Sequence, residues 1–300
     1  MRSIAVVLLL VLTLAGCGRD EPTDDARGYT VRVGDVERTY QVHVPAAVEG
    51  RTGVPAVIVL HGGGGNGSQV AEQTGFSALA DREGFLAVYP DGSGRTSLKT
   101  WNAGTCCSYA RDHDVDDVGF VRTLIDALTE RFGAGRVYVT GFSNGAMLSY
   151  RLGCELADRI TAIAPVSGAL NVPSCEPARP LPVYTIHGDA DDVVPYTGGT
   201  SKSRIASEER AGSHRSVTDA VEFWTRTDRC AGEPVRTTRG AITTVRYTGC
   251  AAGTEVRLDT VAGGGHAWPG GDAVRRGADR PTTELDATAE IWDFFRAHES

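Results

Sequence analysis

The chain has 300 residues, of which 41% are hydrophobic and 23% charged, an ordinary globular composition that excludes collagen-like repeats, coiled coil and wholesale disorder. This length allows one large α/β domain or two small ones, with ample chain to bury a core. The formal net charge of −8 has the wrong sign for a protein that neutralises phosphates, so nucleic acid is not an expected partner.

The N-terminal segment has the pattern of an export signal followed by a tether. A basic residue precedes an apolar run at residues 4–14, and small residues precede Cys17. The run is too short for a stable spanning helix and predicts a secretory signal peptide over residues 1–16. The stretch LAGC, which ends at Cys17, resembles a bacterial lipobox and predicts a lipid anchor in the membrane. Residues 17–28 are then the lipidated cysteine and a flexible tether, and residues 29–300 one folded domain outside the cytoplasm.

Strands that alternate with helices are expected along the folded part. Residues 30–44 alternate apolar and polar side chains around Gly34-Asp35, which predicts a hairpin. The continuous apolar run at 54–60 predicts a strand buried on both faces. Further strands are expected at 85–89, 136–140, 160–166, 183–186, 243–247 and 255–261. Helical patterns occupy 68–82, 115–132, 144–156, 216–227 and 284–298. This order predicts a single-domain α/β fold with a mostly parallel central sheet and helices on both faces.

The candidate nucleophile is Ser143 in the stretch GFSNG. The stretch follows an expected strand and precedes an expected helix, the context in which G-x-S-x-G forms a nucleophile elbow. The sharp turn needs small neighbours, and the helix N-terminus directs its N–H groups and its dipole at a developing oxyanion. The pentapeptide alone is a weak signal, so its partners elsewhere in the chain decide the interpretation.

A serine nucleophile needs a base and an orienting carboxylate, and in this fold both follow it in the chain. The stretch HGDADDVVP follows an expected strand and offers Asp191 as the acid, with Asp192 second and Asp189 third. Turn or cap formation is expected to use at least one of the three. The stretch GGGHAWPG places His266 in a glycine loop after a later strand, so His266 is the candidate base.

The glycine-rich stretch HGGGGNG is the candidate oxyanion loop. Gly63 is expected to supply one N–H donor and Asn144, the residue after the nucleophile, the second. A phosphate cradle is the alternative, but no G-K-[ST] follows, which excludes a P-loop. Rossmann spacing can be read from Gly62, Gly64 and Gly67, yet it lacks the acidic residue at the expected strand end. We therefore expect no nucleotide and no other cofactor.

Export changes the meaning of the cysteines. Without Cys17, six remain, an even number that suggests up to three disulfides in an oxidising compartment: Cys106, Cys107, Cys154, Cys175, Cys230 and Cys250. Cys230 and Cys250 flank one expected strand and form the best single pair, and the others are left open among themselves. A zinc site is not expected, because the chain has no CxxC pair and no histidine at ligand spacing. The acidic stretch HDVDD could suggest calcium, but capping of the helix that follows is the preferred interpretation.

The combination of VLHGGGGN, WNAGTCC, VDDVGF, GFSNGAMLSYRL, HGDADDVVPY and GGGHAWPG resembles the polyhydroxybutyrate depolymerase and feruloyl esterase group of α/β-hydrolases. This group is similar to carbohydrate esterase family 1, and the lipoprotein esterases of actinobacteria match best. The resemblance spans about residues 30–297. It implies Ser143, Asp191 and His266 as the triad, with Trp268 near the substrate. Trp101 in WNAG is expected to line the same cleft, and plain core packing is the alternative for each tryptophan.

These observations predict an exported, membrane-tethered serine esterase that works through an acyl-enzyme on a small or oligomeric ester. Short-chain or hydroxyalkanoate esters are preferred, and feruloyl or acetyl esters on polysaccharide are the alternative. The span 195–214 is rich in Ser, Gly and charge, unlike an apolar lid, which makes a long-chain lipase a poorer fit. An envelope binding lipoprotein on a non-catalytic hydrolase scaffold is the alternative of another class, and a peptidase is a further option. No obligatory protein partner is evident.

Overall fold

The computed structural model describes residues 28–202, 213–273 and 277–299. The expected signal peptide, Cys17 and nearly all of the expected tether lie outside these residues, as does most of the span between Tyr196 and His214. Within the described ranges, no helix is long and apolar enough to cross a membrane.

One ten-stranded sheet runs through the molecule in the order β1-β2-β4-β3-β5-β6-β7-β10-β9-β8. The six central strands from β4 to β10 are parallel, and antiparallel pairs extend the sheet at both edges. The strands are β1 (Gly28–Val33), β2 (Val36–His43), β3 (Val54–Leu60), β4 (Leu86–Pro90), β5 (Ala134–Phe142), β6 (Ala162–Val166), β7 (Val183–Gly188), β8 (Val235–Arg239), β9 (Ile242–Tyr247) and β10 (Val256–Val261). The expected mostly parallel α/β sheet is confirmed, and so is the hairpin, whose turn is Gly34-Asp35.

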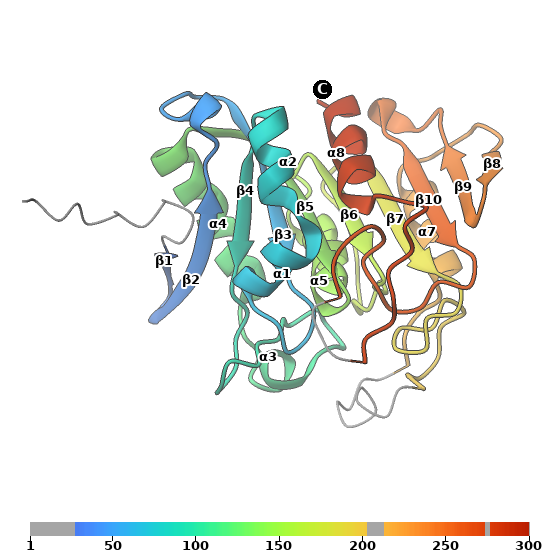
Figure 1. The fold of residues 1–300 in the computed structure, drawn as a ribbon, viewed down its shortest axis with the longest axis horizontal. Coiled ribbons are helices and arrows are strands. Elements are labelled where there is room, and N and C mark those ends of the chain that lie inside the picture. Colours follow the sequence, from blue (N-terminus) through green and yellow to red (C-terminus); the bar gives the residue numbers. More distant parts are fainter. Residues whose placement is uncertain (1–27, 203–212, 274–276, 300) are drawn as a thin grey trace, which may run out of the picture.

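Helices cover both faces of the sheet, as expected (Figure 1). Helices α1 (Gly67–Thr74), α2 (Phe76–Glu83) and α8 (Ala287–Ala297) pack on one face with one apolar cluster. Helices α4 (Asp117–Phe132), α5 (Asn144–Glu155) and α7 (Val217–Thr227) pack on the other with a second cluster. The short helix α3 (Ser108–Asp112) and the 3-10 turns η1 (Ala46–Val48) and η2 (Ala251–Gly253) lie in connections.

The expected single helix over 68–82 is wrong, because the chain breaks it into α1 and α2. Gly75 stands at the break with φ +68°, a left-handed conformation that ends α1 and starts α2. The expected cap of α4 is confirmed, since the Asp116 carboxylate accepts a hydrogen bond from Gly119 N at 2.7 Å.

Three disulfides are present, and the expected Cys230–Cys250 pair is one of them. It joins the segment after α7 to the segment after β9. Cys154 at the end of α5 pairs with Cys175. The neighbours Cys106 and Cys107 pair with each other in the loop between β4 and α3.

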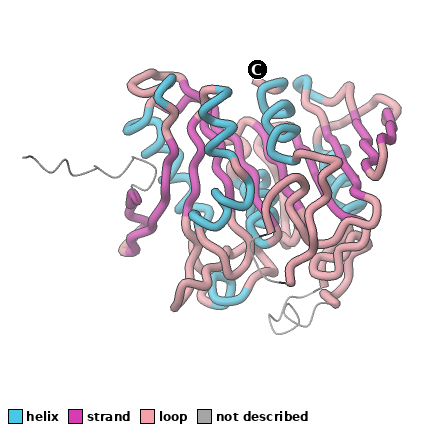
Figure 2. The backbone as a smooth tube through the Cα atoms, viewed as in Figure 1, coloured by secondary structure: helices cyan, strands magenta, loops and turns pink. Residues whose placement is uncertain are grey.

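The parallel strands bring their following loops to one edge of the sheet, where Figure 2 shows irregular chain gathered. The loops after β3, β5, β7 and β10 all lie at this edge. Each of them carries one of the sequence motifs singled out above, so the fold alone brings these motifs together.

Candidate active site

Ser143 occupies a sharp turn between β5 and α5. Its backbone has φ 56° and ψ −118°, a strained conformation for a residue with a side chain. The turn requires glycine on both sides of it. A Cβ on Gly141 would approach the Gly145 carbonyl carbon to 2.7 Å, and a Cβ on Gly145 would meet the backbone oxygens of Leu60 and His61. The elbow can therefore form only because Gly141 and Gly145 let two backbone segments touch.

The structure brings Ser143, His266 and Asp191 into one hydrogen-bonded chain. His266 Nε2 lies 2.9 Å from Ser143 Oγ, and His266 Nδ1 lies 2.8 Å from Asp191 Oδ2. The Phe142 ring packs against the imidazole with centroids 4.7 Å apart, which restricts its rotation. Phe142 has no chemical function of its own, and the sequence analysis did not select it.

Asp191 is held as a buried carboxylate. Oδ1 accepts hydrogen bonds from Val193 N and Val194 N, both at 2.8 Å. Burial raises the pKa of Asp191, but hydrogen bonds from His187 and His266 outweigh it and hold the pKa well below its usual value. Asp191 is therefore ionised at neutral pH, as a group that orients an imidazole and stabilises its cation must be.

His187 lies behind Asp191 and is fully enclosed. Its Nε2 donates to Val194 O at 2.8 Å and lies 3.4 Å from Asp191 Oδ2. Nε2 therefore carries a proton. The sequence analysis treated this histidine only as the first residue of the stretch 187–195, called here the acid loop because it carries Asp191. The signal that could have indicated its role was its position four residues before Asp191.

The two other carboxylates of the acid loop, Asp189 and Asp192, make different contacts. Asp189 Oδ1 accepts a hydrogen bond from Gly263 N at 2.6 Å and so connects the acid loop with the histidine loop, residues 263–270, which carry His266. Asp192 is exposed and faces Lys202 at 3.6 Å. Asp279, which the sequence analysis missed, accepts from His266 N at 2.7 Å and holds the histidine loop from its other side.

The oxyanion loop follows β3, and His61 braces it. Gly92 N donates to His61 Nε2 at 2.9 Å, so the ring proton is on Nδ1 and points to Gly62 O at 2.8 Å. Gly63 borders the active-site cavity next to Ser143. Asn144 is the first residue of α5, where a backbone N–H has no acceptor within the helix. The residues of both expected donors therefore border the cavity together with Ser143.

A family model described as Esterase PHB depolymerase matches residues 38–178 of the chain. Feruloyl esterase B of Piromyces equi is 34% identical over 235 residues, which cover 75% of this chain and 42% of that protein. NocK of Nocardia uniformis subsp. tsuyamanensis, which is named as an esterase, is 33% identical over 278 residues, which cover 85% of this chain and 78% of that one.

The protein is an α/β-hydrolase esterase of the PHB depolymerase family. The acetyl xylan esterase from Aspergillus awamori superposes with a TM-score of 0.60 at 14% identity, covering 90% of this chain and 99% of that one. Esterase PE8 gives a TM-score of 0.53 at 20% identity. At these identities both structures show the fold alone.

The esterase has a cavity of about 460 Å³ above Ser143, within the range of ordinary ligand pockets. Apolar groups of the disulfide, Phe142 and Met147 form part of its wall, and polar groups such as Gln69 and Asp279 form the rest. Within the described ranges, no group of three or more His, Cys, Asp or Glu side chains could hold a metal ion.

The expectation that Trp101 lines the cleft is wrong. Trp101 is fully buried, and its Nε1 donates to His61 O at 2.9 Å. Its backbone exchanges two hydrogen bonds with the Asn144 side chain, at 2.7 and 3.0 Å. Trp101 therefore supports Asn144 and His61, which belong to the two segments expected to supply the oxyanion donors. The pattern WNAG could not distinguish these positions, because an aromatic residue in a loop suits either a core or a cleft.

Trp268 borders the cavity with its ring fully buried. The indole N–H donates to Thr288 Oγ1 at 3.0 Å, and the ring packs edge-on against Phe76. Trp268 thus anchors the loop that carries His266 to the helices α2 and α8, and its side chain supports the cavity wall.

Proposed function

We propose that the protein is a serine esterase in which Ser143 is the nucleophile, His266 the general base and Asp191 the orienting acid. The observation that carries this proposal is the continuous chain of hydrogen bonds from Ser143 Oγ through His266 to Asp191 Oδ2, at 2.9 and 2.8 Å. A cavity large enough for a small ester lies directly above it.

In this mechanism His266 Nε2 takes the Ser143 proton as Oγ attacks the ester carbonyl. The N–H groups of Gly63 and Asn144 stabilise the oxyanion that forms. His266 then gives the proton to the leaving alcohol, which produces an acyl-enzyme. Water attacks the acyl-enzyme with His266 again as base, and Ser143 is regenerated.

Export and a lipid anchor at Cys17 complete the proposal. The pattern of residues 1–17 supports both, and three disulfides support an oxidising compartment. The partner that we propose for this site is the ester substrate.

Short-chain or hydroxyalkanoate esters are the first substrate candidate. The match to the PHB depolymerase family model and the modest size of the cavity support it. Hydroxycinnamoyl or acetyl esters of polysaccharide are the second candidate, because relatives include a protein named feruloyl esterase B and one named bifunctional acetylxylan esterase/xylanase. Both candidates use the same catalytic groups, so only a substrate panel can rank them.

The test compares the protein from about residue 28 with its Ser143→Ala variant on p-nitrophenyl esters of increasing chain length, methyl ferulate, acetylated xylan and 3-hydroxybutyrate oligomers. We expect Ser143→Ala to lower kcat by at least about 10⁴-fold, since it removes the nucleophile. Ser68→Ala is the matched control, because Ser68 is exposed and its Oγ accepts a hydrogen bond from Gln41 Nε2 at 2.8 Å.

Each outcome has a definite meaning. Serine-dependent turnover supports the esterase, and the preferred substrate separates the two candidates. Turnover that survives Ser143→Ala would remove Ser143 from the mechanism. A wild-type protein that cleaves no ester and does not react with a fluorophosphonate probe would favour the binding-protein alternative, and cleavage of peptide amides would favour a peptidase.

A further inference from the structure

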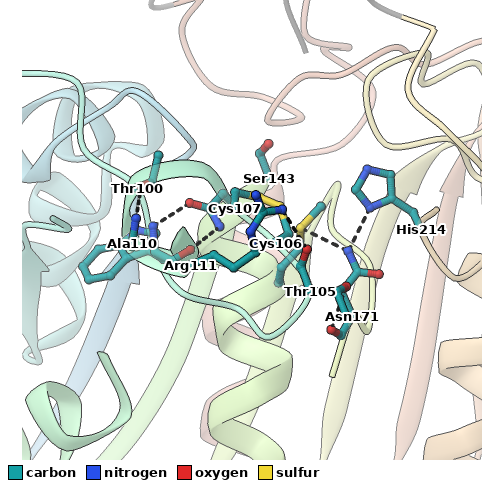
Figure 3. Close-up of a disulfide and its surroundings, with 12 residues drawn as sticks. Thr100, Thr105, Cys106, Cys107, Ala110, Arg111, Ser143, Asn171 and His214 are labelled. Carbon is teal, nitrogen blue, oxygen red and sulfur yellow. Dashed lines mark hydrogen bonds between the residues drawn. A yellow bond between two sulfur atoms is a disulfide. The ribbon is translucent and has the colours of Figure 1, made fainter. Parts of the chain in front are cut away.

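One wall of the cavity beside Ser143 is formed by side chains that contain sulfur. Cys106 and Cys107 border the cavity with their mutual disulfide, and Met147 borders it from the first turns of α5. Figure 3 shows the disulfide close below Ser143. Sulfur atoms are polarizable and apolar, and they contact aromatic or aliphatic groups favourably. This wall therefore suits an apolar part of the ester.

The loop that carries the disulfide is fixed from two sides. Cys107 N donates to Trp101 O at 3.1 Å. Thr105 donates to Asn171 O through both its backbone N, at 2.9 Å, and its hydroxyl, at 3.1 Å. Asn171 thus joins the disulfide loop to the segment after β6.

Asn171 also determines the protonation of a histidine at the rim of this wall. Its Oδ1 accepts a hydrogen bond from Arg215 N at 3.4 Å, so Nδ2 is the atom that faces His214 Nδ1 at 2.8 Å. An amide nitrogen can only donate, so Nδ1 of His214 must be the acceptor. The proton of the neutral His214 ring is therefore on Nε2.

His214 is held in place and lies at the cavity. Its backbone exchanges two hydrogen bonds with Gly199, both at 2.9 Å. His214 borders the cavity and is 6% exposed. Burial lowers the pKa of His214 below its ordinary value, so the ring is neutral at neutral pH. Nε2 lies at the ring edge away from Asn171 (Figure 3), and none of the described residues accepts its proton.

We propose that His214 is a specificity-determining residue, which donates a hydrogen bond from Nε2 to an oxygen of the substrate other than the scissile carbonyl. The adjoining carbon skeleton of the substrate rests on the wall of Cys106, Cys107 and Met147. The substrate class is an ester with an apolar body and an additional hydroxyl, ether or carbonyl oxygen. This inference rests on the proposed function, because it needs an ester bound above Ser143.

The test uses two pairs of esters in which one member carries additional oxygen: methyl 3-hydroxybutyrate with methyl butyrate, and methyl ferulate, which has a ring hydroxyl and a methoxy group, with methyl cinnamate. The quantity measured is the ratio of kcat/KM within each pair. We expect His214→Phe, which keeps a planar ring without the N–H, to lower this ratio about tenfold in at least one pair, the effect of one lost hydrogen bond. His214→Gln, which retains an N–H donor, should restore the ratio to within about threefold.

Thermal unfolding shows whether each variant is folded, and His214→Ala replaces His214→Phe if the latter does not fold. Equal losses on both members of each pair leave the ratio of kcat/KM unchanged. This outcome would assign His214 a merely structural role and overturn the inference, and so would variants with no loss at all. A wild-type protein that cleaves none of the four esters overturns the proposed function and this inference with it, which distinguishes that failure from a failure of His214 alone.

Discussion

At the scale of single residues, Asp189, Asp191 and Asp192 show how environment assigns three roles to one side-chain type. The Asp191 carboxylate is fully buried and accepts from His266 Nδ1 at 2.8 Å. The Asp192 side chain is 69% exposed and pairs loosely with Lys202. Asp189 receives the Gly263 N–H. Only Asp191 has both the contact with the imidazole and the enclosure that make a carboxylate effective in orienting it.

Substitution of these carboxylates by asparagine should separate the three roles. Asp191→Asn should lower kcat by about 10⁴-fold, because an amide favours the wrong tautomer of the base. Asp192→Asn should change kcat by less than about twofold, since exposed ion pairs contribute little. The measurement is steady-state hydrolysis of a p-nitrophenyl ester. If Asp192→Asn proved as damaging as Asp191→Asn, the triad assignment would be wrong.

Asp189→Asn tests the contact between the acid loop and the histidine loop. An asparagine oxygen can still accept from Gly263 N, so the variant should retain most of the activity, whereas Asp189→Ala should lose the contact and lower kcat by roughly tenfold. Hydrolysis rates of both variants with the same ester provide the comparison. Equal activity of the two variants would show that the contact does not position His266.

The proposed catalytic residues could be selected from the sequence because each one lies in a backbone context that its chemistry requires. Ser143 needs flanking glycines, and His266 follows three glycines beyond a strand. Asp191 was ranked above Asp192 and Asp189 in the loop after the strand, and the resemblance implied the same residue, but all three follow the same strand and only the structure shows which one meets His266. Trp101 was misplaced, because no local pattern shows whether a loop aromatic is covered by other segments. The disulfide wall and His214 come together from segments far apart in the chain, so no local pattern in the sequence indicates that they meet.

At the scale of elements, the nucleophile elbow depends on backbone contact between β3, β5 and α5. Gly145→Ala would place a methyl group against the Leu60 and His61 carbonyls. We expect this variant to lose about 3 kcal/mol in free energy of unfolding and most of its activity, because α5 must move away from the oxyanion loop.

Urea unfolding and ester hydrolysis check this prediction together. Gly28→Ala is the matched control, because a Cβ there has nothing within 4 Å and should leave both measurements nearly unchanged. A Gly145→Ala variant with wild-type stability and activity would show that the elbow accommodates a side chain at this position.

Strands were easier to predict than helix boundaries, for a physical reason. Buried parallel strands need continuous apolar runs, and β3 has the bounds 54–60 that its run predicted. The apolar periodicity at 68–82 continues across Gly75 because α1 and α2 face the same core, although the backbone turns between them. Strand β8 was missed because it lies exposed at the sheet edge, where no burial pattern is required.

At the scale of the whole molecule, one carboxyl group is fully buried where α7 ends against the sheet. The core under α7 encloses Asp228, whose Oδ1 accepts from Leu181 N at 3.1 Å. Its Oδ2 is buried and has no hydrogen-bond partner among the described residues. Burial raises the pKa of Asp228 to about 6. The carboxyl is thus more easily protonated in the folded state than in the unfolded chain.

Asp228 should make the folded protein less stable as pH rises. Between the unfolded pKa of about 3.9 and the folded value of about 6, the folded state binds the extra proton, so the stability contributed by the neutral carboxyl is lost as pH increases through this window. Above it, the buried anion costs about 3 kcal/mol. Asp228→Asn keeps the group neutral at every pH, and we expect it to raise Tm by about 5 °C at pH 8 and by little at pH 4. Thermal unfolding at both pH values, with exposed Asp158→Asn as control, measures the difference. An Asp228→Asn effect of the same size at pH 4 and pH 8 would mean that the carboxyl does not titrate between them, and that its buried oxygen has a partner in solution.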